Sequence, residues 1–83
     1  MEKYNLMGVV ISNRKDFAPA VQEVLTEFGC IIKMRIGLHE GIENSCSNEG
    51  FIILELADDD NKINSFIRKL ERIESVRIKN VKL

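Results

Sequence analysis

The chain has 83 residues, of which 45% are hydrophobic and 30% are charged, and its net charge at pH 7 is -1. This length predicts one domain, 1–83, and this composition is typical of a globular protein, which excludes a disordered chain and a membrane span. A charge so close to zero gives no electrostatic attraction to nucleic acid, so we expect no direct binding of DNA or RNA and no membrane partner.

The first predicted elements are a strand and a helix. Residues Tyr4 to Ser12 are apolar at both odd and even positions, which indicates a central strand covered on both faces. Asp16 then has the position of a helix N-cap, and apolar residues follow at helical spacing as far as Phe28. Gly29 is placed to end this helix as a left-handed C-cap.

The second strand and the loop after it are predicted from alternation and composition. From Ile31 to His39, apolar residues alternate with a second set that includes Lys33 and Arg35, which indicates an edge strand with one buried face. Residues 40–50 are polar and rich in Gly and Ser, so they predict a long loop.

The second half of the chain predicts another strand, helix and strand. Residues Phe51 to Ala57 are apolar on both faces, as in a central strand. Three acidic residues, 58–60, precede a helical pattern, and we expect them to stabilise the positive end of that helix rather than to form a divalent-ion site. The alternation from Val76 to Lys79 predicts a last edge strand.

The order β-α-β-β-α-β predicts an α+β fold of the ferredoxin-like type. In this fold the fourth strand lies beside the first, followed by the third and the second, in a four-stranded antiparallel sheet with two helices on one face. The two strands that are apolar on both faces then fall at the centre, as burial on both sides requires.

The face of the sheet that the helices leave uncovered is expected to join copies of the chain. Its centre would hold four large apolar side chains, each worth roughly 1.5–3 kcal/mol when fully buried, with basic residues of the edge strands around them. We therefore expect a homo-oligomer, a dimer or a tetramer. The alternative is a solvated face with scattered hydrophobic residues, which is common on monomers. The predicted interface residues are Leu6, Val10, Lys33, Arg35, Phe51, Ile53 and Arg77, with Lys79 beside them.

Few residues offer chemistry. His39 and Cys46 could supply an imidazole and a thiolate to a transition metal, but a structural site needs four ligands, so a second subunit would have to complete it. No nucleophile stands beside a base and no Gly-rich phosphate loop is present, so we expect neither an enzyme nor a cofactor. Glu2 and Lys3 lead straight into an apolar run, unlike a secretion signal, which favours a cytoplasmic location with Cys30, buried, and Cys46 as free thiols.

Three segments carry a likeness to a known family: GVVISNR (8–14), EFGCIIKMRIGLHE (27–40) and KLERIESVRIKNV (69–81). In them the chain resembles the small regulators of the iron-only hydrogenase system, over nearly its whole length. That family is similar to ACT domains and to the C-terminal ligand-binding domain of the nickel-responsive regulator. The resemblance implies a cytoplasmic, oligomeric regulatory module that binds a small effector between subunits.

The resemblance also implies where an effector would bind. In ACT domains it lies near the first strand-to-helix turn, which here contains Ser12, Asn13, Arg14 and Asp16. Three functions therefore stay open: an effector-responsive regulator, which we favour, a structural oligomerisation module without an effector, and a transition-metal sensor.

Overall fold

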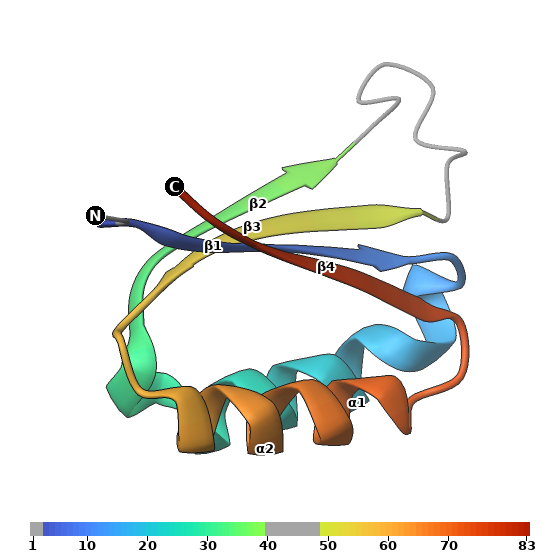
Figure 1. The fold of residues 1–83 in the computed structure, drawn as a ribbon. Coiled ribbons are helices and arrows are strands. Elements are labelled where there is room, and N and C mark those ends of the chain that lie inside the picture. The colour runs from blue at the N-terminus through green and yellow to red at the C-terminus, as the bar shows by residue number, and fades with distance from the viewer. Residues whose placement is uncertain (1–2, 40–48) are drawn as a thin grey trace.

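The computed structural model describes residues 3–39 and 49–83, which form two layers: a four-stranded sheet and a pair of helices that cover one of its faces (Figure 1). The elements in chain order are β1 (Asn5–Ile11), α1 (Arg14–Glu27), a 3-10 turn (Gly29–Ile31), β2 (Ile32–His39), β3 (Gly50–Leu56), α2 (Asp60–Glu71) and β4 (Val76–Lys82). The strand order is β2-β3-β1-β4, and all neighbours are antiparallel. The predicted ferredoxin-like α+β fold is confirmed.

The core lies between the sheet and the helices. Alternate residues of β1 and β3 point toward the helices, and residues at helical spacing on α1 and α2 meet them. Phe28, just after α1, also packs against Phe66 of α2, with 5.0 Å between the ring centroids. The buried apolar residues of the described chain are Met7, Val9, Ile11, Val21, Leu25, Ile31, Ile52, Leu54, Leu56, Ile63, Phe66 and Leu70.

The start of α1 differs from the prediction. The N-cap is Asn13, not Asp16, and the Asn13 side chain donates to the Asp16 carboxylate (3.0 Å) instead of capping the helix. Ser75, in the turn before β4, holds the short turn between β1 and α1. The Ser75 carbonyl accepts from the Ser12 backbone N–H (2.8 Å), and its Oγ accepts from the Asn13 backbone N–H (3.3 Å).

The end of α1 also differs from the prediction. Gly29 does not adopt a left-handed conformation; instead the chain passes through Phe28, with φ −101°, into the 3-10 turn. Ile31 closes this turn by donating its N–H to the Phe28 carbonyl (3.0 Å), and its side chain is buried. Ile31 takes the buried place in this turn and Cys30 is exposed, so the expectation of a buried Cys30 was wrong.

A bulge in β2 decides which of its side chains face the helices. Ile32 pairs with Leu56, but Met34 already pairs with Glu55, so one extra residue, Lys33, is inserted on this strand. Ile32 packs against the core, whereas Met34 lies on the opposite face. A strict alternation would have placed both on one face, because side chains two positions apart point the same way in a regular strand.

The bulge corrects two sequence-based expectations. Arg35 pairs with Leu54 on the helix side of the sheet, and its guanidinium donates to the Gln22 side chain of α1. Its predicted place at the border of the uncovered face was therefore wrong. Met34 and Ile36, which strict alternation assigned to a buried face, are instead 39% and 45% exposed.

Candidate functional site

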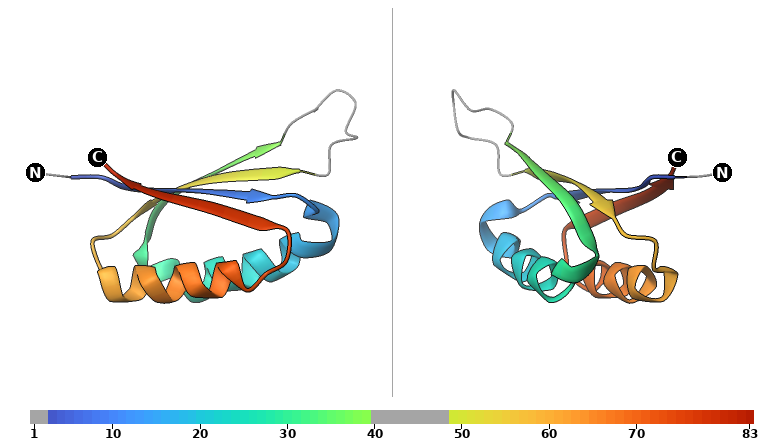
Figure 2. Two further views of the ribbon diagram at one scale, coloured as in Figure 1. Left: turned by 45° about the vertical axis from the view of Figure 1, so that its right-hand side comes forward. Right: turned by 90° about the vertical axis from the view of Figure 1, so that its left-hand side faces the viewer.

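The uncovered face of the sheet has an apolar centre. Leu6 and Val10 of β1 and Phe51 and Ile53 of β3 are half-buried, and they alternate with residues that point into the core, as the sequence predicted. Two views of the molecule show both helices on the other side (Figure 2). Gly8, between Leu6 and Val10, lies beside the Phe51 ring: a Cβ at this position would be in ordinary van der Waals contact, 3.4 Å, with Cε1 of Phe51.

The edge strands enlarge this apolar centre beyond the prediction. Met34 and Ile36 add to it from β2, and Val81 of β4, which pairs with Leu6, is 43% exposed. The apolar residues of β2 could be read from the sequence, but their face could not, because no turn or Gly signal marks the bulge at Lys33. We call this set the sheet patch; its members are Leu6, Val10, Met34, Ile36, Phe51, Ile53 and Val81.

Charged residues of both signs border the sheet patch. Arg77 pairs with Val10 across the β1–β4 ladder, and its guanidinium lies 3.7 Å from the Glu49 carboxylate. On the β2 side, the Lys33 ammonium lies 3.8 Å from the Glu55 carboxylate. The side chains of Arg77, Glu49 and Lys33 are exposed and that of Glu55 is half-buried, so each pair contributes only about 0–1 kcal/mol to stability. An apolar centre inside a charged border is the general anatomy of a protein interface.

The four residues of the predicted effector site lie together in the β1–α1 turn and the first turn of α1. Ser12 and Asp16 are exposed, and Asn13 and Arg14 are half-buried. The backbone N–H groups of Ser12 and Asn13 already donate to Ser75, so they are not available to a ligand in this conformation.

Arg14 packs along the start of β3. A Cβ at Gly50 would lie 3.1 Å from Cδ of Arg14, so the arginine stem covers the backbone where that strand begins. An effector in the turn would therefore meet the Ser12 hydroxyl and the Asp16 carboxylate more readily than the Arg14 stem.

The predicted metal ligands cannot be placed. Cys46 and the side chain of His39 lie outside the described residues. Within residues 3–39 and 49–83, no cluster of three or more His, Cys, Asp or Glu side chains has the proximity that a metal ion requires. The helices in these two ranges are all too short or too polar to span a membrane.

Comparison with known proteins assigns the chain to a family. The model of TM1266-like proteins, described provisionally as iron-only hydrogenase system regulators, matches residues 3–80. The chain belongs to this family. The resemblance seen in the three sequence segments is thus confirmed, over nearly the full length of the chain. No curated protein matches the chain by sequence.

Solved structures support the family and the fold. The uncharacterized protein TM1266 from Thermotoga maritima is similar with a TM-score of 0.82 and 28% identity, over 100% of this chain and 99% of that one. The ACT domain of GTP pyrophosphokinase from Chlorobium tepidum has a TM-score of 0.71 and 11% identity, over 98% and 100% of the two chains. The PII-like protein CPII from Thiomonas intermedia K12 has a TM-score of 0.61 and 8% identity, over 96% and 89%. The last two likenesses show a shared fold.

Proposed function

We propose that this protein is a cytoplasmic regulatory module of an iron-only hydrogenase system, which acts as a homo-oligomer and responds to a small effector. The observation that carries the proposal is the sheet patch: a broad apolar face opposite the helices, on a chain whose family is described as regulators. A regulatory rather than a catalytic role also agrees with that description.

The energetics of the sheet patch favour association. Complete burial of a Val, Leu, Ile, Phe or Met side chain is worth roughly 1.5–3 kcal/mol, and the patch holds members from all four strands. Set against a domain stability of about 5–15 kcal/mol, removal of this surface from water is a large term. Contiguous apolar patches of this kind usually mark interaction sites.

A second copy of the chain is the partner that the border of the patch favours. The border presents basic groups, such as Arg77 and Lys33, close to acidic ones, Glu49 and Glu55. In a two-fold interface the same patch meets itself, so a border with both signs can place opposite charges across the contact. A border of one sign would repel its own copy.

The shared fold supports the proposal that the protein binds a small effector. CPII, which shares the fold, is described as bound to ADP, AMP and bicarbonate. We keep Ser12, Asn13, Arg14 and Asp16 as a proposed contact region, in which the exposed Ser12 and Asp16 side chains would act. The second candidate, a structural module without an effector, is favoured by the same sheet patch and differs only in its response to ligands.

Thermal denaturation against amino acids, nucleotides, carboxylates and divalent metals separates the two candidates. A ligand present at 100 times its Kd should raise the free energy of unfolding by about 2.7 kcal/mol, which corresponds to a rise in Tm of roughly 10–20 °C for a domain of this size. Sodium chloride at the same ionic strength is the control. A Tm that stays constant across the whole panel would contradict the effector and leave the structural module. A response to nickel or zinc that His39→Ala abolishes would instead support the metal sensor.

A further inference from the structure

Gly8 lies at the centre of the uncovered face of the sheet. It is the middle residue of β1, and it pairs with Ile53, the middle residue of β3. Lys79 of β4 pairs with Gly8 from the other side, and Ile36 of β2 pairs with Ile53. These four residues form one row across the sheet, which we call the central row. Three of them carry large side chains, so the row has a gap at Gly8 directly beside Ile53.

The described part of the chain does not require a glycine at this position. The φ of Gly8 lies outside the left-handed region, and β1 pairs with both of its neighbours without a bulge. Apart from its chain neighbours, a Cβ at Gly8 would meet only the Phe51 ring within 4 Å, in ordinary contact. Glycine inside a strand weakens the strand, and it often marks a position that another molecule approaches closely. A group from a second molecule above Gly8 would account for the missing side chain.

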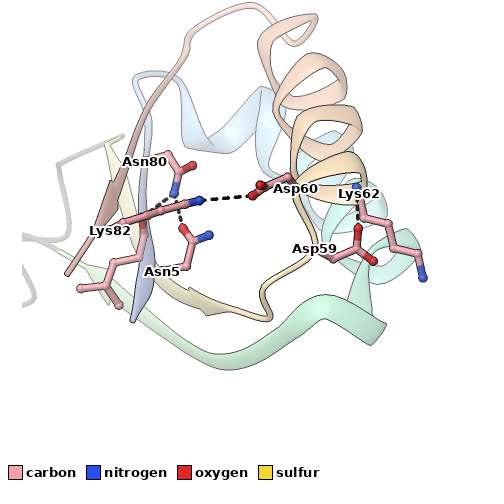
Figure 3. Close-up of polar contacts among 7 residues, drawn as sticks. Asn5, Asp59, Asp60, Lys62, Asn80 and Lys82 are labelled. Atoms are coloured by element: carbon pink, nitrogen blue, oxygen red, sulfur yellow. Dashed lines mark hydrogen bonds and ion pairs between the residues drawn. The ribbon is translucent and has the colours of Figure 1, made fainter. Parts of the chain in front are cut away.

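Contacts on the helix side of the sheet hold the register that forms the central row. Nδ2 of Asn80 in β4 donates to Oδ1 of Asn5 (2.6 Å) and to the Leu6 carbonyl oxygen (2.8 Å) in β1 (Figure 3). The Lys82 ammonium of β4 also lies 3.2 Å from the Asp60 carboxylate of α2. Because β4 is attached to both β1 and the helix layer, the gap at Gly8 keeps its position among its neighbours.

A second copy of the chain fills this gap in one of two possible face-to-face arrangements. When two sheets stack with their strands aligned, a two-fold axis between them runs either across the strands or along them. If it is centred on the Gly8–Ile53 pair, an axis across the strands sets each of these residues against its own copy. Two isoleucines then collide beside an empty space. An axis along the strands instead exchanges β1 with β3, so Ile53 of each copy lies above Gly8 of the other.

The axis along the strands also brings apolar residues of the sheet patch together. Because it exchanges β1 with β3 and β2 with β4, residues of the same row meet across the contact. The apolar pairs that it forms on either side of the central row are Phe51 with Val10 and Met34 with Val81.

The charged residues of the face fit the same arrangement. Lys79 would lie above Ile36 at the edge of the stacked sheets, where its aliphatic stem covers the isoleucine and its ammonium extends into water. Glu55 would meet Leu6, and the Lys33 ammonium of its own chain lies 3.8 Å from its carboxylate. No like charges meet in these two contacts.

We propose that two copies of the chain pack sheet against sheet, with the Ile53 side chain of each copy in the gap above Gly8 of the other. The inference rests on the proposed function, because it requires the sheet patch to join two copies. It adds the contact that determines how the two copies are oriented.

An exchange of side-chain size between two chains tests this contact. Gly8→Val fills the gap, and Ile53→Ala shortens the side chain that occupies it. Each variant alone should therefore form a weaker homodimer, with an apparent dissociation constant raised at least about 10-fold. In an equimolar mixture, the added valine of one chain meets the shortened residue 53 of the other, and the second contact is that of the wild type. Native mass spectrometry should then show the mixed dimer well above its proportion in random pairing.

Gly37→Val is the matched control. Gly37 is an exposed glycine of β2 that pairs with the core residue Ile52, so the same side chain is added on the helix side. Its homodimer should keep the wild-type affinity. Circular dichroism checks that each variant is folded, and Gly8→Ala replaces Gly8→Val if the latter does not fold.

The outcomes separate this contact from the proposed function. A random proportion of mixed dimer, or wild-type affinity in both single variants, would overturn the contact, while a dimeric wild type would still support the proposed oligomer. A wild-type mass of one copy would overturn both.

Discussion

Ser75 joins two turns of the fold from an unusual backbone conformation. Its φ is 70°, in the left-handed region that non-glycine residues seldom occupy. From this position its carbonyl and hydroxyl oxygens accept from the backbone N–H groups of Ser12 and Asn13. The turn before β4 and the turn after β1 are thereby held together, and α1 begins immediately after them.

The balance between that strain and that hydrogen bond can be measured. Ser75→Ala loses the hydroxyl acceptor and keeps the left-handed backbone, so the free energy of unfolding should fall by about 1 kcal/mol. Ser75→Gly loses the same bond but removes a left-handed cost of roughly 1 kcal/mol, partly offset by the greater freedom of glycine in the unfolded chain. Urea denaturation should therefore give a higher free energy of unfolding for the glycine variant than for the alanine variant. The reverse order would contradict the conclusion that the left-handed backbone at Ser75 is strained.

Such contacts could not be predicted from the sequence because they join distant residues. Asn13 and Ser75 are 62 positions apart, and Asn5 and Asn80 are 75 apart. Local signals instead favoured Asp16 as the N-cap of α1 and Gly29 as its C-cap, and both were wrong. The β1–α1 turn was nevertheless foreseeable as a place where polar side chains gather, since Ser12 to Asp16 follow an apolar strand directly.

At the scale of the elements, the sequence predicted the features that follow from a regular spacing of apolar residues. It missed the features that follow from an interruption of that spacing. The order of strands and helices, the sheet order and the core faces of β1 and β3 all follow from regular alternation and helical spacing. The face of β2 does not, because the insertion at Lys33 inverts it, which moves Arg35 to the helix side and Ile36 to the sheet patch. A composition rich in apolar residues cannot reveal a one-residue shift in register.

The start of α2 bears out an element-scale expectation, that acidic residues 58–60 stabilise the positive end of this helix, and the structure shows which of them is the cap. Asp59 is the N-cap, and its carboxylate accepts from the backbone N–H of Lys62 (3.2 Å). Asp59→Ala should lower the free energy of unfolding by about 1 kcal/mol, whereas Asp59→Asn, which keeps an acceptor, should cost much less. Asp58→Ala is the matched control, because Asp58 is exposed and precedes the cap. If both alanine variants lose the same stability in urea, general charge rather than the cap would be responsible.

At the scale of the whole molecule, one face of a two-layer fold is left to be covered. Two helices protect the core side of the sheet, and the sheet patch lies on the other side (Figure 2). Multi-angle light scattering of the purified chain should give a mass of two or four copies of the 9.5 kDa protein at micromolar concentration. A mass of one copy at high micromolar concentration would contradict the proposed oligomer.

Ile36→Lys tests whether the sheet patch is the surface through which copies associate. Ile36 is 45% exposed in the single chain, so a lysine there can extend into water and the monomer should keep its fold. In an interface the same ammonium would be buried without a partner, which costs several kcal/mol, so the apparent dissociation constant should rise by at least about 100-fold. Thr26→Lys adds the same charge at an exposed position of α1, on the helix side, and should leave the mass unchanged. Equal masses for the two variants, with native circular dichroism, would place the interface elsewhere.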